Sequence, residues 1–415
     1  MPDAARRVQR TYLLLTLLAT MASSFIWGIN TLFLLDAGLS NAEAFAANAF
    51  YMLGMVIFEV PTGVVADSRG RRFSYLLGAA TLLVSTLLYL YMWQLEAPLW
   101  GWALASVGIG LGYTFFSGAT EAWLVDALTA TGYRGDLESV FARGQVVGGV
   151  AMLSGSVMGG FVAQFTNLGV PYILRAGMLL LALLAAFRLM HDLGFAPATG
   201  VRSSTRVRQI LAASIENGLR NRPVRWLMLA APFTAGVSYY VFYASQPYLL
   251  ELYGDEAAFG VAGLTAAIVA LADIVGGLLI RRVRRFFVHR THALILGTVG
   301  TVAVLAGVGL TRSFALAVAL IVIWSLLSAM TDPMRQAYLN GLIPSEQRAT
   351  VLSFDSLFSS VGGVVTQPPL GRVADLGGYG ASYLVSAGVT ALAVPFLALA
   401  HRERAAADVI ADDPA

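Results

Sequence analysis

Carboxyl side chains inside long apolar runs are the groups of this sequence best placed to carry chemistry. They are Glu59, Glu121, Asp126, Asp273, Asp332 and Asp355. A charge within a membrane span costs about 2.5–3.5 kcal/mol on insertion scales, so each acid calls for a partner or a function. Burial lets a carboxyl group change protonation near neutral pH, which proton-coupled transport requires. For any single acid, a gate or a structural ion pair is the competing interpretation.

Helical spacing ranks these acids. Glu121 and Asp126 are five residues apart, about 140° around a helix, so they face different neighbours. Glu121 is the deeper of the two. Asp332 precedes Pro333, and proline frees a backbone carbonyl, which suits a bent helix that lines a cavity. We therefore expect Glu121 and Asp332 to be the first proton-coupling candidates, followed by Glu59 and Asp273.

Composition predicts an all-α polytopic membrane protein. The 415 residues are 57% hydrophobic and 12% charged, with a mean hydropathy of +0.71. Apolar runs of about 20 residues recur, whereas barrel strands would alternate over about 10. All 27 basic residues are arginine, which indicates a GC-rich bacterial genome, and cysteine is absent. Thiolate catalysis and cysteine metal sites are therefore excluded.

Breaks at charges, prolines and glycines predict twelve transmembrane helices. The expected spans are 12–35, 44–66, 73–94, 98–124, 139–165, 169–190, 224–250, 258–281, 290–310, 314–340, 349–371 and 379–400. With the N-terminus in the cytoplasm, Arg175, Arg312 and Arg372 fall outside and the other arginines inside. Both termini are therefore expected to be cytoplasmic, in a bacterial cell membrane.

The spans form two six-helix halves, 1–190 and 224–402, joined by a cytoplasmic loop at 191–223 and followed by a disordered tail at 403–415. The loop suits either a helix on the membrane surface or a flexible linker. Short motifs recur in order at nearly one spacing: Ser117–Glu121 with Ser328–Asp332, and Gly160–Ala163 with Gly371–Ala374. Parallel six-span repeats of this kind are typical of a transporter with a pathway between the halves.

A glycine, an acid and three arginines lie within the ten residues Gly63-Val-Val-Ala-Asp67-Ser-Arg69-Gly70-Arg71-Arg72. This stretch resembles the loop signature of the major facilitator superfamily, Gly-x-x-x-Asp-(Arg)-x-Gly-Arg-(Arg/Lys), with Ser68 at a usually basic position. An ordinary basic loop is the alternative. The resemblance implies alternating access, with Asp67 contacting a helix of the second half and the arginines pairing with Asp126. The residues that it assigns to the gate are Gly63, Asp67, Gly70, Arg71, Arg72 and Asp126.

Span five resembles a second superfamily signature. Its segment Gly155-Ser-Val-Met-Gly159-Gly160 is similar to the antiporter pattern Gly-Pro-x-x-Gly-Gly, with Ser156 in place of proline. The match favours export, although the same glycines also suit close helix packing. Span four lacks the membrane arginine of many drug–proton antiporters, because Tyr113 and Thr114 occupy that region.

In the superfamily, spans one, four, seven and ten face the pathway. The substrate-cavity residues that this implies are Trp27, Asn30, Phe33, Tyr113, Phe116, Tyr239, Tyr240, Tyr243, Gln246 and Trp324. Aromatic rings with a few polar groups suit an amphipathic organic ligand, whereas an anion site would want an arginine in mid-membrane. Core packing or an interfacial belt is the alternative for each ring.

The sequence as a whole predicts proton-coupled efflux of an amphipathic drug or metabolite by a monomer in the bilayer. Its expected partners are a small-molecule substrate and protons, with no cofactor, metal or nucleic acid. The chain has no lysine for a Walker-type Gly-x-x-x-x-Gly-Lys loop and no His-Glu-x-x-His run, so no enzyme is expected. An importer of a nutrient and a non-transporting sensor or assembly factor are the alternatives.

The gate assignment can be tested with Asp67→Asn and Arg71→Ala. We expect either substitution to abolish transport while the protein still inserts and folds, because only the charge of the loop is changed. Flux measurements together with gel filtration check this. Transport near the wild-type rate in either variant would remove the loop from the mechanism.

Overall fold

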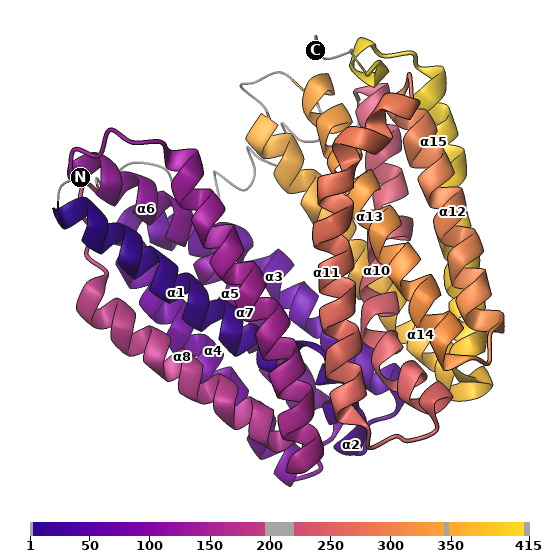
Figure 1. Cartoon of the computed structure of the whole chain (residues 1–415), viewed down its shortest axis with the longest axis horizontal. Helices are drawn as coiled ribbons and strands as arrows, with labels where there is room; N and C mark the ends of the chain where they lie inside the picture. Colours follow the sequence, from indigo (N-terminus) through magenta and orange to yellow (C-terminus); the bar gives the residue numbers. More distant parts are fainter. Residues whose placement is uncertain (1–2, 196–219, 344–347, 411–415) are drawn as a thin grey trace. The chain divides into compact units, whose positions relative to one another are not determined.

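The structure is a computed structural model that describes residues 3–195, 220–343 and 348–410, and within these ranges every regular element is a helix (Figure 1). The central segment that suited a surface helix or a linker lies mostly in 196–219, outside the described residues. The helices of the first half are α1 (Asp3–Trp27), α2 (Asn30–Asp36), α3 (Asn41–Arg69), α4 (Arg71–Gln94), α5 (Leu99–Phe116), α6 (Ala119–Ala130), α7 (Leu137–Phe165) and α8 (Gly169–Leu189). Those of the second half are α10 (Arg222–Tyr253), α11 (Phe259–Val283), η2 (Arg284–Phe286), α12 (Arg290–Leu310), α13 (Phe314–Leu342), α14 (Arg348–Ala391), α15 (Ala393–Arg402) and η4 (Ala406–Asp408).

Three breaks in the described helices explain how these elements correspond to the twelve expected spans. In the described part of the chain, ten helices are long and apolar enough to cross a membrane, or eleven when the α1–α2 pair, bent by 51°, counts as one span. The longest apolar stretch, Phe354–Arg402, contains the non-helical Gly378 (φ 79°), which separates the last two expected spans. A third break, at Gly118 (φ 66°), divides span four into α5 and α6.

The helices form two compact units, each with its own apolar core. The N-terminal unit contains most of the first half, and its core includes the fully buried rings of Tyr75 and Trp123. The C-terminal unit contains most of the second half, with Tyr240 and Tyr383 in its core. Each core is apolar because the helices turn their small and aromatic residues toward one another.

Each unit also includes the first turns of one helix from the other half of the sequence. Ser40–Ala49, at the start of α3, belongs to the C-terminal unit, and Ala257–Ala267, at the start of α11, to the N-terminal unit. Glycine permits both approaches. A Cβ on Gly371 would lie 2.7 Å from the carbonyl oxygen of Asn41, and a Cβ on Gly160 would lie 2.5 Å from that of Phe259.

The residues that follow these glycines cap the incoming helices. The Asp375 carboxylate accepts hydrogen bonds from the backbone amides of Asn41 (2.8 Å) and Ala42 (3.0 Å) at the start of α3. At the equivalent place in the other repeat, Gln164 Oε1 accepts one from Gly260 N (2.8 Å) at the start of α11. Helix starts carry unsatisfied amides and a partial positive charge, so both side chains stabilise the turn they meet. The repeated Gly-x-x-Ala motif of the sequence therefore marks a pair of helix-docking sites.

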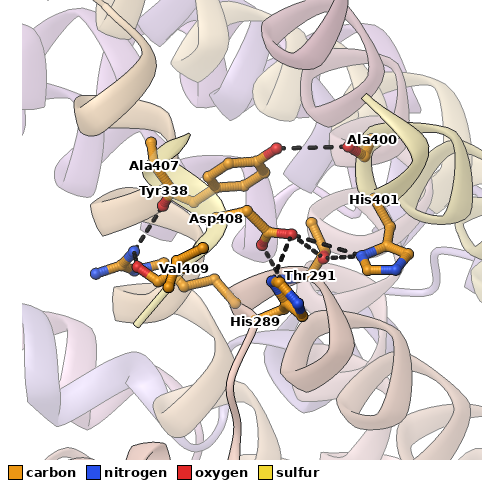
Figure 2. Close-up of polar contacts among 9 residues, drawn as sticks. His289, Thr291, Tyr338, Ala400, His401, Ala407, Asp408 and Val409 are labelled. Atoms are coloured by element: carbon orange, nitrogen blue, oxygen red, sulfur yellow. Dashed lines mark hydrogen bonds and ion pairs between the residues drawn. The ribbon is translucent and has the colours of Figure 1, made fainter. Parts of the chain in front are cut away.

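The C-terminal tail corrects an expectation. Residues 403–410, expected to be disordered, are ordered and packed against the start of α12 (Figure 2). The Asp408 carboxylate, 2% exposed, accepts hydrogen bonds from Thr291 N (2.8 Å) and Thr291 Oγ1 (2.7 Å). Arg290 donates to the carbonyls of Ala407 and Val409. An acidic composition suggested solvation, but Asp408 serves as a cap for α12.

Removal of the α3 cap gives a prediction. Asp375→Ala should weaken the first turn of α3 by about 1 kcal/mol, equivalent to about a fivefold faster amide exchange at residues 41–45. Hydrogen–deuterium exchange with peptide mapping measures this. Gln164→Ala is the matched control, since it should act on the start of α11 and leave α3 unchanged. Unaltered exchange at residues 41–45 in Asp375→Ala would contradict the capping role.

Candidate functional site

The turn between α3 and α4 requires glycine at Gly70. Its φ of 107° is unfavourable for residues with a side chain, and a Cβ there would overlap the Asp192 carboxylate. That carboxylate accepts a hydrogen bond from Arg72 N (2.8 Å) and so caps α4 from the far end of α8. Sequence reasoning missed Asp192, because the residue lies 120 positions from its partner and belongs to no motif.

The arginines of this loop differ from expectation in their partners. Arg71 forms an ion pair with Asp67 (2.6 Å), four residues earlier, and Arg72 donates to the carbonyl of Phe187 (2.6 Å). Pairing of either arginine with Asp126 is not seen among the described residues. The Asp67–Arg71 pair joins the last turn of α3 to the first residue of α4, because the turn at Gly70 brings the two side chains together.

The C-terminal unit contains a cavity of about 640 Å³ between α10, α12, α13 and α14. Serine and threonine hydroxyl groups make up most of its polar wall, and they come from Thr234, Ser238, Thr298, Thr301, Ser328, Thr331, Ser356, Ser359 and Thr390. The amides of Gln336 and Asn340 and the rings of Tyr239 and Trp324 complete the polar and aromatic lining. Aliphatic side chains such as Leu305, Leu339 and Leu352 also line the cavity, so the wall suits a solute that has both polar groups and apolar surface.

Three charged residues line this cavity, and only two of them are paired with each other. Arg335 holds Asp355 in a two-point ion pair, with Nη1–Oδ2 at 2.8 Å and Nη2–Oδ1 at 2.5 Å. Asp332 also lines the cavity, yet it makes no hydrogen bond or ion pair within the described ranges. Asp273, ranked after Asp332 from the sequence, accepts a hydrogen bond from Ser325. Of these acids, Asp332 is the one on the cavity wall without a hydrogen bond among the described residues, and Arg335 attracts it at longer range.

The acids of the N-terminal unit lie around the break in span four. Glu121 begins α6 and lines a smaller cavity, of about 350 Å³, together with Phe116 and Gln145. Glu59 accepts a hydrogen bond from Ser117 Oγ (2.8 Å), directly at the break. The broken helix thus exposes the carboxyl groups that the sequence ranked as candidates. Asp126, one turn further along α6, is half-buried.

Some expected cavity aromatics are core residues. Phe33 is fully buried and stacks on Tyr172, with ring centroids 4.0 Å apart. Tyr240 is fully buried, packs against Phe45 and is hydrogen-bonded to Ser382. Residue type alone does not separate a lining ring from a core ring, because both lie on apolar helix faces.

The remaining candidates divide between structural and half-buried positions. Gln246 is 3% exposed, and Asn30 Oδ1 accepts a hydrogen bond from Tyr172 (2.9 Å). Trp27 and Tyr243 are half-buried. Tyr113 is half-buried as well and contacts Arg175, a buried arginine that sequence reasoning had placed at the outer end of span six. In the antiporter-like segment, Gly155 and Gly159 pack against α1, and Gly160 packs against the start of α11.

A family model described as Major Facilitator Superfamily matches residues 12–291 and 262–413, which together cover nearly the whole chain. The chain belongs to the Major Facilitator Superfamily. Membership identifies a multi-pass membrane transporter rather than an enzyme and agrees with the all-helical, two-unit fold. No curated protein sequence matches the chain significantly.

Solved structures of other superfamily-type transporters share the fold. The nucleoside transporter NupG superposes with a TM-score of 0.76 at 12% identity, over 96% of this chain and 99% of that one. A D-xylose–proton symporter gives 0.66 at 16% identity, over 95% and 96%. A bacterial homologue of the human lysosomal transporter Spinster gives 0.71 at 15%, over 97% and 98%. At these identities the likeness concerns the fold alone.

The ion pair in the cavity wall leads to a stability prediction. Asp355→Ala should cost about 3 kcal/mol, because it leaves the Arg335 guanidinium largely buried without its counter-charge. Asp332→Asn should cost much less, under about 1 kcal/mol, since that carboxyl group has no hydrogen bond to lose and is attracted by Arg335 only at longer range. Thermal unfolding of the purified protein in detergent compares the two. Equal losses in both variants would show that the pair contributes no special stability.

Proposed function

We propose that this chain is a proton-coupled transporter that exports a small organic metabolite rich in hydrogen-bonding groups. Family membership supports a transporter of small molecules, and the single observation that supports coupling is Asp332. Its carboxyl group lies on the wall of a cavity without a partner among the described residues. Proton binding at such a position changes the charge of the cavity by one unit, which is what coupling requires.

The sequence predicts an amphipathic substrate, and the lining supports a substrate that combines hydrogen-bonding groups with apolar surface. Two of the aromatic residues behind that expectation, Phe33 and Tyr240, are buried in the core. The hydroxyl and amide groups of the cavity offer donors and acceptors, while Trp324 and Tyr239 offer one aromatic surface. A metabolite with several hydroxyl, amide or carbonyl groups and one apolar face fits this combination.

Separate observations support export and uptake. The partial antiporter signature at Gly155–Gly160 supports export. One structural neighbour is described as a D-xylose–proton symporter, and its likeness supports uptake as the second candidate. We propose export from the cytoplasm across a bacterial cell membrane by a monomer. The non-transporting alternative gives no reason for an unpaired acid on a cavity wall.

Flux in proteoliposomes tests the proposal. The panel contains radiolabelled nucleosides, pentoses, dipeptides and small carboxylic acids, with and without an imposed pH gradient. We expect the gradient to drive accumulation of at least one compound, and Asp332→Asn to reduce this at least tenfold while counterflow exchange continues, because only the coupling step is lost. Glu138→Gln, at an exposed position at the start of α7, is the matched control and should behave as wild type.

Three results would contradict parts of the proposal. Accumulation that ignores the gradient would exclude proton coupling. Gradient-driven accumulation that Asp332→Asn leaves intact would exclude this residue as the coupling acid. Absence of flux for every compound in a correctly inserted wild-type protein would favour the non-transporting sensor or assembly factor.

A further inference from the structure

A buried arginine in the N-terminal unit has no acidic partner. Arg175 lies on α8, and its side chain is 1% exposed. It reaches toward α1, α4 and α5, where Nε donates to Thr86 Oγ1 (3.0 Å) and Nη1 donates to Ala22 O and Tyr113 OH (both 3.3 Å). All three acceptors are neutral. Within the described ranges, Nη2 makes no hydrogen bond and no carboxylate pairs with this guanidinium.

The cost of this arrangement is high. Removal of a guanidinium from water costs several kcal/mol, and hydrogen bonds to neutral groups recover only part of that. A glutamine at this position would satisfy similar acceptors without a charge. Arginine is always charged, so its positive charge persists at every physiological pH. An uncompensated cation inside the helix bundle is therefore a strong source of positive potential.

Tyr113 connects this charge to a more accessible surface. Its half-buried ring lies beside the guanidinium, whose central carbon is 5.8 Å from the ring centroid. Ser23 Oγ donates to Ala19 O (3.1 Å) and lies 2.7 Å from Tyr113 OH, so the tyrosine donates to the serine and accepts from Arg175. A bound oxyanion can replace Ser23 as the acceptor of the Tyr113 hydroxyl, with the charge of Arg175 directly behind it.

We propose that Arg175 and Tyr113 form an anion-binding subsite in the N-terminal unit, so that the transported metabolite carries a carboxylate or phosphate group. The two open N–H donors of Nη2 and the Tyr113 hydroxyl match two oxygens of one oxyanion. This subsite rests on the proposed transport function for its biological use. Its existence as a binding site is independent of transport and is tested by binding alone.

The test measures ligand-induced thermal stabilisation of the purified protein in nanodiscs, without any gradient. The probes are matched pairs of an anion and its neutral counterpart: benzoate with benzamide, nicotinate with nicotinamide, and glycerol 3-phosphate with glycerol. The first two pairs report a carboxylate site and the third a phosphate site. We expect the anion of at least one pair to bind wild type at least tenfold more tightly than its neutral counterpart.

The variants separate charge recognition from structure. Arg175→Gln should abolish the preference for the anion while it leaves binding of the neutral counterpart unchanged, and Arg175→Lys should retain part of the preference. Tyr113→Phe should weaken anion binding by about five- to tenfold and serves as the second test if Arg175→Gln does not fold. Arg372→Gln, at an exposed arginine of the C-terminal unit, is the matched control and should keep the wild-type preference.

Two outcomes would overturn the proposal. One is a wild-type protein that binds no anion more tightly than its neutral counterpart in any pair. The other is an Arg175→Gln or Tyr113→Phe variant that folds and keeps the full preference. If anion binding follows the expected pattern but no flux is found in proteoliposomes, the subsite stands and the transport proposal fails.

Discussion

The cost of charge in an apolar helix bundle is the constraint on which the rest of this structure depends. Where a charge has only a structural use, the fold supplies its counterpart, as Arg335 does for Asp355. Two groups break this rule within the described residues. Asp332 faces a hydroxyl-lined cavity without a partner, and Arg175 is enclosed by neutral acceptors. Because neither charge has a hydrogen-bonded counter-charge among the described residues, they are the groups on which the proposals of proton coupling and anion recognition rest.

The first amides of helices are a second kind of polar group that this fold must satisfy. The first amides of a helix lack intrahelical partners, and this chain satisfies several of them with side chains from distant segments. Asp375 caps α3, Gln164 caps α11, Asp192 caps α4 and Asp408 caps α12. The first two occupy corresponding places in the two repeats and join a helix start to the opposite half of the sequence.

Sequence patterns predicted the family and the spans, but span four was expected to be unbroken. The structure divides it at Gly118, and Glu59 and Glu121 lie beside that break. The patterns were less successful for individual partners. Arg71 binds Asp67 rather than Asp126, Phe33 and Tyr240 pack in the core, and residues 403–410 are ordered. Each of these errors concerns which groups meet across the fold, and residue type carries little information about that.

Hydropathy and arginine placement by themselves predicted a twelve-span membrane protein, because the bilayer imposes length and charge rules that are local in sequence. The resemblance of Gly63–Arg72 to a known loop signature pointed to the superfamily. Only the tertiary structure decided which charges are compensated. Asp332 and Asp355 are both acids on spanning helices, yet one has an arginine within hydrogen-bonding distance and the other has no partner in the described chain. Arg175 likewise resembled an outer-end arginine until the packing of α8 against α1, α4 and α5 placed it inside the bundle. Electrostatic energy depends on distance and burial through space, and separation along the chain does not encode either quantity.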